Sequence, residues 1–161
     1  DPGLAFGTGS HATTRLMLQW LDEQDLNGKT VVDYGCGSGI LGIAAAKLGA
    51  KNVMAIDYDP QALTATKRNA QDNQIAHQID VFLPDDAPAM HADIVLANIV
   101  INPLIVLRPT FFDLLKTNGT LVVSGVLHTQ CEELIQSFQT LFDHQTTVQD
   151  EDWCRLTFIK P

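Results

Sequence analysis

The sequence has 161 residues, 45% hydrophobic and 18% charged, which is typical of one globular domain with a substantial core. Its 10 basic and 19 acidic residues give a net charge of −9, which argues against direct nucleic-acid binding because a phosphate backbone needs a concentrated basic surface. The absence of a long apolar run predicts no membrane span, and the absence of a basic-then-apolar N-terminus predicts no secretory signal.

Short β-branched runs alternate with helical periodicity along the chain, which predicts βαβ units on a mostly parallel sheet. We expect strands at 30–34, 52–57, 78–83, 93–97, 120–124, 145–149 and 154–159. We expect helices at 13–25, 40–48, 60–72, 102–116 and 129–142. The pattern predicts an open α/β sheet of seven strands with helices on both faces, in which the last two strands form an antiparallel hairpin.

The cysteines and histidines show no spacing that is typical of a structural bond or a metal site. Cys36, Cys131 and Cys154 are far apart and odd in number, so a disulfide framework is not indicated. The five histidines lack the short-range pairing of a zinc site. We therefore expect no metal and a reducing compartment, the cytoplasm.

A glycine-rich segment, Gly35-Cys36-Gly37-Ser38-Gly39, lies directly between an expected strand and an expected helix. Glycines let a backbone approach a ligand closely, and the start of the helix offers unpaired N–H groups. A tight turn in any doubly wound protein is the alternative. The spacing is G-x-G-x-G with Asp33 two residues before, which differs from the dinucleotide spacing G-x-G-x-x-G and is similar to the first motif of class I methyltransferases.

Asp57 ends the second expected strand, where a carboxylate can accept hydrogen bonds from both hydroxyls of a ribose. A helix-capping role is the alternative, although Asp59 before Pro60 is better placed for it. Ribose binding by Asp57 does not by itself distinguish a nicotinamide dinucleotide from S-adenosylmethionine.

Two further segments carry candidate binding residues. The run 7–14, with Thr8, Gly9 and Thr14, is rich in glycine and hydroxyl groups and is able to fold over a ligand, although a frayed terminus with a helix cap explains it equally well. Asn98 follows the fourth expected strand, at the sheet edge where ligands bind in open α/β folds. Its carboxamide is suited to orient a substrate amine, and a structural turn is the alternative.

Together these motifs resemble the PrmA family, methyltransferases of a large-subunit ribosomal protein called L-eleven. The resemblance implies a class I, Rossmann-like methyltransferase domain over residues 1–161, and the family has a small substrate-recognition domain upstream, which fits a chain that opens on Asp1 rather than Met. It assigns S-adenosylmethionine contacts to Thr14, Gly35, Asp57 and Asn98, and the glycine loop adds Gly37. It runs from the opening Asp-Pro-Gly-Leu-Ala-Phe-Gly-Thr-Gly, through the glycine loop, Asp57 and Asn98-Ile99, to Trp153-Cys154-Arg155.

The resemblance implies methyl transfer to lysine or N-terminal amines of that ribosomal protein, with Asn98 as the catalytic residue. The acceptor must be neutral, and burial would lower the pKa of a lysine from its usual value of about 10.4. The run Val100-Ile101-Asn102-Pro103 is bulkier than in the family, which leaves another protein or a small molecule open as acceptor. An NAD-binding oxidoreductase domain and a domain that only binds cofactor are further alternatives.

Overall fold

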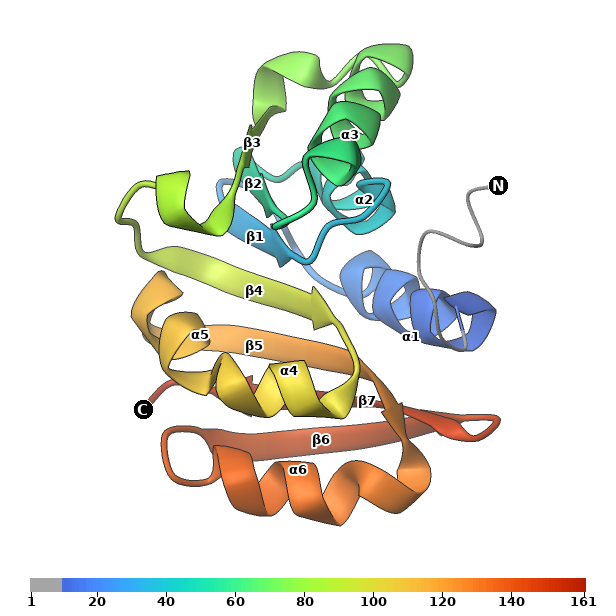
Figure 1. Cartoon of the computed structure of the whole chain (residues 1–161), viewed down its shortest axis with the longest axis vertical. Coiled ribbons are helices and arrows are strands. Elements are labelled where there is room, and N and C mark those ends of the chain that lie inside the picture. The colour runs from blue at the N-terminus through green and yellow to red at the C-terminus, as the bar shows by residue number, and fades with distance from the viewer. Residues whose placement is uncertain (1–9) are drawn as a thin grey trace.

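The computed structural model describes residues 10–161, and a seven-stranded sheet runs through their middle (Figure 1). The strand order is β3-β2-β1-β4-β5-β7-β6. Strands β1 to β5 pair in parallel, and β7 pairs antiparallel with both β5 and β6, which confirms the predicted sheet and C-terminal hairpin. The strands are β1 Thr30–Tyr34, β2 Asn52–Ile56, β3 Ile79–Phe82, β4 Ala92–Asn98, β5 Leu115–Leu127, β6 Asp143–Asp150 and β7 Trp153–Ile159.

Helices cover both faces of the sheet, as predicted (Figure 1). Helices α1 Ser10–Asp22, α2 Ile40–Lys47 and α3 Pro60–Asp72 pack on one face, and their apolar side chains form one core with β1, β2 and β4. Helices α4 Ile101–Val106, α5 Arg108–Leu114 and α6 Cys131–Phe138 pack on the other face, around a second core that contains the buried phenylalanines. Short 3₁₀ turns lie at Ala76–Gln78, Pro84–Asp86 and His128–Gln130.

The start of α3 follows the predicted capping pattern. Asp59 has an extended backbone, and its side chain accepts a hydrogen bond from the Gln61 N–H at 2.9 Å. Pro60 occupies the first helical position, where its missing N–H costs nothing. Because Asp59 fills the capping role, the neighbouring Asp57 is left for another one.

The helix predicted at 102–116 is wrong: α4 and α5 are separate helices that meet at Leu107. Pro109 has no N–H to bond the Ile105 carbonyl, so the helical ladder cannot continue through it. The Arg108 side chain replaces that donor, because its Nε bonds the Ile105 carbonyl at 2.9 Å, while its Nη1 bonds the Ser137 carbonyl at 2.7 Å.

The fifth strand also begins earlier than predicted, at Leu115 rather than at residue 120. Leu115 pairs with Ala92, and the register then shifts before Thr120 pairs with Ile94. The end of the helix predicted at 129–142 is also wrong, since α6 ends at Phe138. None of the helices within residues 10–161 is long and apolar enough to cross a membrane.

Candidate functional site

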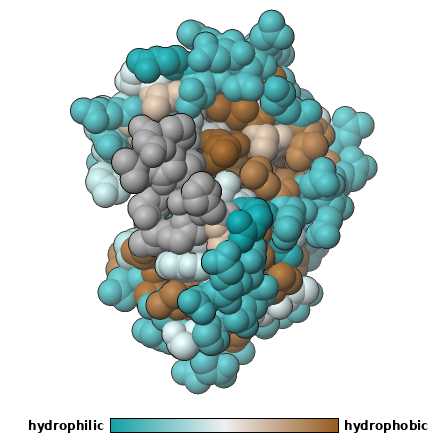
Figure 2. All heavy atoms as spheres, turned by 90° about the vertical axis from the view of Figure 1, so that its right-hand side faces the viewer, coloured by the Kyte–Doolittle hydropathy of each residue, from teal (hydrophilic) through white to brown (hydrophobic). Residues whose placement is uncertain are grey.

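A cavity of about 1370 Å³ opens at the carboxyl ends of β1, β2 and β4. The strand order reverses at β1: β2 and β3 are added on one side of it, and the chain then crosses over to place β4 on the other side. Open α/β folds bind ligands at such a switch point. Figure 2 looks onto this edge and shows hydrophobic side chains gathered there, with hydrophilic ones around them.

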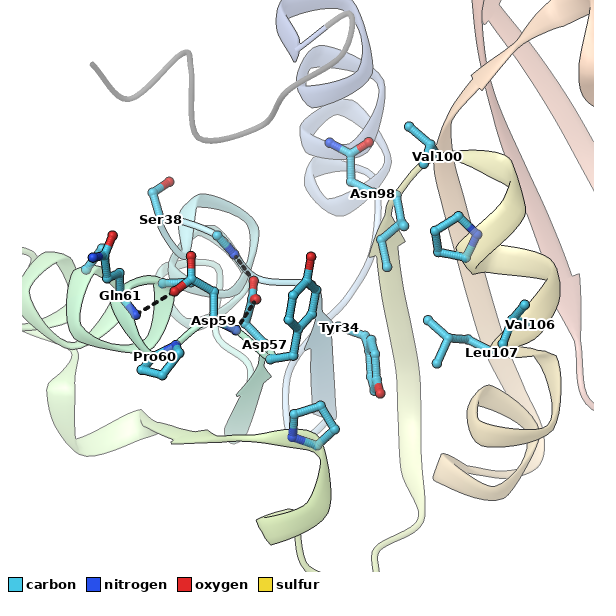
Figure 3. A pocket seen from close by; sticks show the side chains of 18 of the residues that line it. Tyr34, Ser38, Asp57, Asp59, Pro60, Gln61, Asn98, Val100, Val106 and Leu107 are labelled. Atoms are coloured by element: carbon cyan, nitrogen blue, oxygen red, sulfur yellow. Dashed lines mark hydrogen bonds between the residues drawn. The ribbon is translucent and has the colours of Figure 1, made fainter.

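The cavity has two walls that face one another across it (Figure 3). We call the first the loop wall, which comes from the β1–α2 loop and the β2–α3 connection and is made of Gly35, Gly37, Ser38, Asp57 and Asp59. We call the second the α4 wall, which follows β4 and is made of Asn98, Ile99, Val100, Asn102, Pro103, Val106 and Leu107.

The backbone N–H groups of the glycine loop are bonded within the protein. Gly35 and Cys36 donate to the Ile56 carbonyl at 2.7 and 3.0 Å, and Gly39 donates to the Cys36 carbonyl at 2.8 Å. Gly37 donates to Asp57 Oδ2 at 3.0 Å. The loop is therefore held by its own hydrogen bonds and offers few N–H groups to an anion.

Gly35 brings the two walls into contact. Its φ is +76°, a conformation that side chains rarely adopt, and a Cβ built there would lie 3.0 Å from the Ile99 Cδ1 of the α4 wall. Glycine at this position therefore meets both a backbone and a packing requirement.

Asp57 is oriented by two backbone donors. Its Oδ2 accepts the Gly37 N–H and its Oδ1 accepts the Asp59 N–H, each at 3.0 Å (Figure 3). A carboxylate oxygen has a second lone-pair site, so each oxygen keeps acceptor capacity toward the cavity.

Asp33 lies behind the loop wall and is 2% exposed. Its Oδ2 accepts the Gly42 N–H of the first turn of α2 at 3.0 Å. The sequence predicted unpaired N–H groups at this helix start, but the Gly42 N–H is not available to a ligand. Burial raises the pKa of the Asp33 carboxyl to about 7, repulsion from Asp57 adds to the rise, and the Gly42 hydrogen bond opposes it. Asp33 thus has a structural position rather than one in the cavity.

Two side chains of α3 brace the loop wall, and the sequence analysis missed both. Thr66 Oγ1 donates to the Gly37 carbonyl at 3.1 Å, and Asn69 Nδ2 donates to the Ser38 carbonyl at 2.8 Å. The signal available was a pair of polar residues three apart on α3, which share one helix face. Cys36 is packed against Thr66, and burial raises the pKa of its thiol to about 12, so it is not a nucleophile at neutral pH.

The α4 wall is apolar apart from its carboxamides. Asn98 ends β4, and its Nδ2 donates to Thr13 Oγ1 of α1 at 3.4 Å. Val100 is 42% exposed and Val106 is 77% exposed, both at the mouth of the cavity. A neutral or apolar group therefore meets less opposition at this wall than a charged one.

The structure thus brings together four of the predicted residues, Gly35, Gly37, Asp57 and Asn98, around one cavity. Thr14 stands on α1 beside Thr13, and its Oγ1 is buried without a hydrogen-bond partner among the described residues. Thr8 and Gly9 lie outside the described residues. Within 10–161, no group of histidines, cysteines and carboxylates is arranged to hold a metal ion.

The sequence pattern of the family described as "Ribosomal protein L11 methyltransferase (PrmA)" matches residues 1–161. The chain belongs to this family. A ribosomal protein L11 methyltransferase of Mannheimia succiniciproducens is 52% identical over 158 residues, which cover 98% of this chain and 54% of that protein. One of Vibrio vulnificus is 53% identical over 158 residues, with 98% and 54% covered. The chain therefore spans about half the length of these relatives.

Solved structures agree with the PrmA assignment and confirm the predicted class I methyltransferase fold. The ribosomal protein L11 methylase of Lactobacillus delbrueckii subsp. bulgaricus matches with a TM-score of 0.88 and 34% identity over 99% of this chain and 83% of that one. An RNA methyltransferase of Salinibacter ruber, solved with S-adenosyl-L-homocysteine, matches with a TM-score of 0.71 and 20% identity over 96% and 93%, and shares the fold.

Proposed function

We propose that this chain binds S-adenosylmethionine and methylates lysine and N-terminal amino groups of a large-subunit ribosomal protein. The observation that carries the proposal is the pairing of a self-bonded glycine loop and a fixed Asp57 with Asn98 on the opposite wall, in a member of the PrmA family. The acidic chain, with a net charge of −9, suits a basic protein acceptor. A ribosomal acceptor implies a cytoplasmic protein, which cell fractionation would test.

The residues around the cavity fit this cofactor. Asp57 would accept the ribose hydroxyls through its remaining lone pairs, and the methionyl part would lie beside Gly35 and Gly37, which line the cavity without a side chain. The Thr14 hydroxyl, which is buried without a partner among residues 10–161, is a donor that a cofactor carboxylate would satisfy. When bound, the cofactor supplies an activated methyl group on a sulfonium.

The α4 wall supplies positioning and desolvation. Its apolar side chains disfavour a charged ammonium, which lowers the pKa of the acceptor and raises the neutral fraction. Asn98 would accept an N–H of the neutral amine and so direct the nitrogen lone pair at the methyl group. Transfer would form the C–N bond as the C–S bond of the sulfonium breaks, and S-adenosylhomocysteine would leave. This wall carries no carboxylate or imidazole among its described residues, so the proton leaves to water.

An NAD-dependent oxidoreductase is the rival that the loop wall argues against. A pyrophosphate needs free N–H groups or cations, yet the N–H groups of Gly35, Cys36, Gly37 and Gly39 are bonded within the protein. No lysine or arginine lines the described part of the cavity. Calorimetry tests this directly: S-adenosylhomocysteine should bind and NAD should not, and the reverse result would overturn the proposal.

The acceptor is tested with labelled S-adenosylmethionine and the purified ribosomal protein. We expect label on lysine and N-terminal amines, and the assay is run on this chain and on a form extended to the length of its relatives. Label in neither form, although S-adenosylhomocysteine binds, would favour a domain that only binds cofactor. Label on RNA or DNA instead would contradict a protein acceptor.

A further inference from the structure

Asn98 has a side-chain partner on another element, Thr13 of α1. The two residues are 85 positions apart in the sequence, and Asn98 Nδ2 donates to Thr13 Oγ1 at 3.4 Å. Thr13 is 0% exposed, so water does not compete for its hydroxyl. Figure 3 shows Asn98 beside α1, the helix that carries Thr13.

In this structure the contact pairs the nitrogen end of the carboxamide with Thr13 and leaves its oxygen end for another partner. A carboxamide is planar, with a donor nitrogen and an acceptor oxygen on opposite sides. Because the Asn98 nitrogen is directed at Thr13, its oxygen is directed away from α1. If the carboxamide were turned by 180°, its NH₂ group would point at the acceptor amine, and it could not accept an N–H from that amine.

The helix that carries Thr13 is itself fixed to the sheet. The Nη1 of Arg155, on β7, donates to the Leu16 carbonyl at 2.6 Å in a buried position. Arg15 forms an ion pair with Asp150 of β6 at 2.9 Å. These contacts with β6 and β7 fix the position of α1 and therefore of Thr13. Thr13 can thus determine the orientation of the Asn98 side chain.

We propose that Thr13 is a positioning residue, which holds the Asn98 carboxamide with its oxygen toward the acceptor amine. The inference rests on the proposed methyltransferase function and on the role of Asn98 in it. In this arrangement the oxygen accepts an N–H of the neutral amine and stabilises the positive charge that the nitrogen gains on methylation. Thr13 acts through Asn98 and does not touch the acceptor.

The hydroxyl, rather than the volume, of Thr13 is what the proposal requires. Thr13→Val keeps the shape and removes the acceptor of the Asn98 N–H, whereas Thr13→Ser keeps the hydroxyl. Thr157→Val is a matched control, because Thr157 is also buried and its hydroxyl is bonded to Thr146 at 2.6 Å on the β6–β7 hairpin.

The experiment measures methyl transfer to the ribosomal protein in the longest natural form of the protein. We expect Thr13→Val to lower kcat about 10-fold, the loss of about one hydrogen bond to a reacting group. The Kd for S-adenosylhomocysteine should stay within about 2-fold, since the loop wall with Gly35 and Asp57 is unchanged. Thr13→Ser should recover most of the rate, and Thr157→Val should leave it unchanged.

A second measurement does not depend on activity. The side-chain NH₂ resonances of Asn98, followed by ¹⁵N NMR, should shift in Thr13→Val and stay near their wild-type positions in Thr13→Ser. A Thr13→Val variant that keeps the wild-type rate or the wild-type NH₂ resonances would overturn the proposal. A Thr13→Ser variant as slow as Thr13→Val would do the same.

A double-mutant cycle separates this inference from the proposed function. If Thr13 acts through Asn98, Thr13→Val should cost nothing further in an Asn98→Ala background. Additive losses would contradict the inference while leaving the role of Asn98 intact. An Asn98→Ala variant with wild-type activity would instead remove Asn98 from the proposed function, and the inference with it.

Discussion

The two walls of the cavity are built on different principles. On the loop wall, the N–H groups of Gly35, Gly37 and Gly39 and both oxygens of Asp57 have hydrogen-bond partners inside the protein. The α4 wall presents exposed valines and one oriented carboxamide, and its helix is six residues long. A self-bonded surface suits a ligand that is always the same, whereas an apolar and lightly bonded one suits a protein segment.

If this division holds, substitutions on the loop wall should change cofactor affinity and those on the α4 wall should change acceptor use. Asp57→Ala should have the largest effect. We expect the Kd for S-adenosylhomocysteine to rise about 100-fold or more, because hydrogen bonds to a charged group contribute about 1.5–3 kcal/mol each. Calorimetry measures this, and Asp59→Ala is the comparison on the same wall: its side chain caps α3, so we expect a much smaller rise in Kd than for Asp57→Ala. Equal losses in both variants would mean that Asp57 acts through the fold.

The buried carboxyl of Asp33, behind the loop wall, should make the unfolding free energy depend on pH. Its folded pKa, about 7, is above the ordinary value of 3.8, so the folded state binds a proton that the unfolded state releases between these values. The unfolding free energy should therefore fall as pH rises, by about 2–3 kcal/mol between pH 5 and pH 7 relative to Asp33→Asn. Urea unfolding at both pH values measures the difference. Parallel pH profiles for the two proteins would contradict the raised pKa.

Gly35→Ala tests the contact between the walls. The positive φ alone should cost about 1–2 kcal/mol of unfolding free energy, and the added Cβ would also press on Ile99. Gly28→Ala is the matched control, because its φ is +75° and nothing lies within 4 Å of its Cβ position. We expect a larger fall in Tm and a weaker S-adenosylhomocysteine complex for Gly35→Ala. Equal effects would mean that the backbone strain explains everything.

Val106→Ser should have the smallest effect, on the α4 wall alone. Loss of part of an exposed apolar side chain should raise the KM for the ribosomal protein about 2–3-fold, from a fraction of a kcal/mol in buried area. The Kd for S-adenosylhomocysteine should not change. Val148→Ser, on β6, is the control with no place at the cavity. If Val106→Ser changed the Kd for S-adenosylhomocysteine but not the KM for the ribosomal protein, the proposed division of roles between the two walls would be wrong.

The parts of the molecule that follow local rules were predictable from the sequence. The glycine loop, the Asp59-Pro60 helix start and the acidic end of β2 each depend on neighbours a few residues away. Contacts between distant segments were not predictable, such as Thr13 with Asn98 or Thr66 with the Gly37 carbonyl. They depend on how helices pack against strand ends, and a single sequence carries no measure of that.

The break at Leu107 was missed for a different reason. The periodicity of 102–116 is helical on both sides of Pro109, and the Arg108 side chain supplies the hydrogen-bond donor that Pro109 lacks. Thr14, whose hydroxyl is buried without a partner in the described part of the chain, stays a predicted cofactor contact.

That break also divides the protein into units of unequal local stability. A helix as short as α4 cannot sustain its own hydrogen bonds in water, so its persistence depends on the tertiary contacts of Ile101 and Leu104 and on the Arg108 link to α6. Its amides are expected to open and exchange with solvent without unfolding of the sheet. The α4 wall, which meets the acceptor, would then change conformation on a timescale at which the hydrogen bonds of the loop wall stay intact.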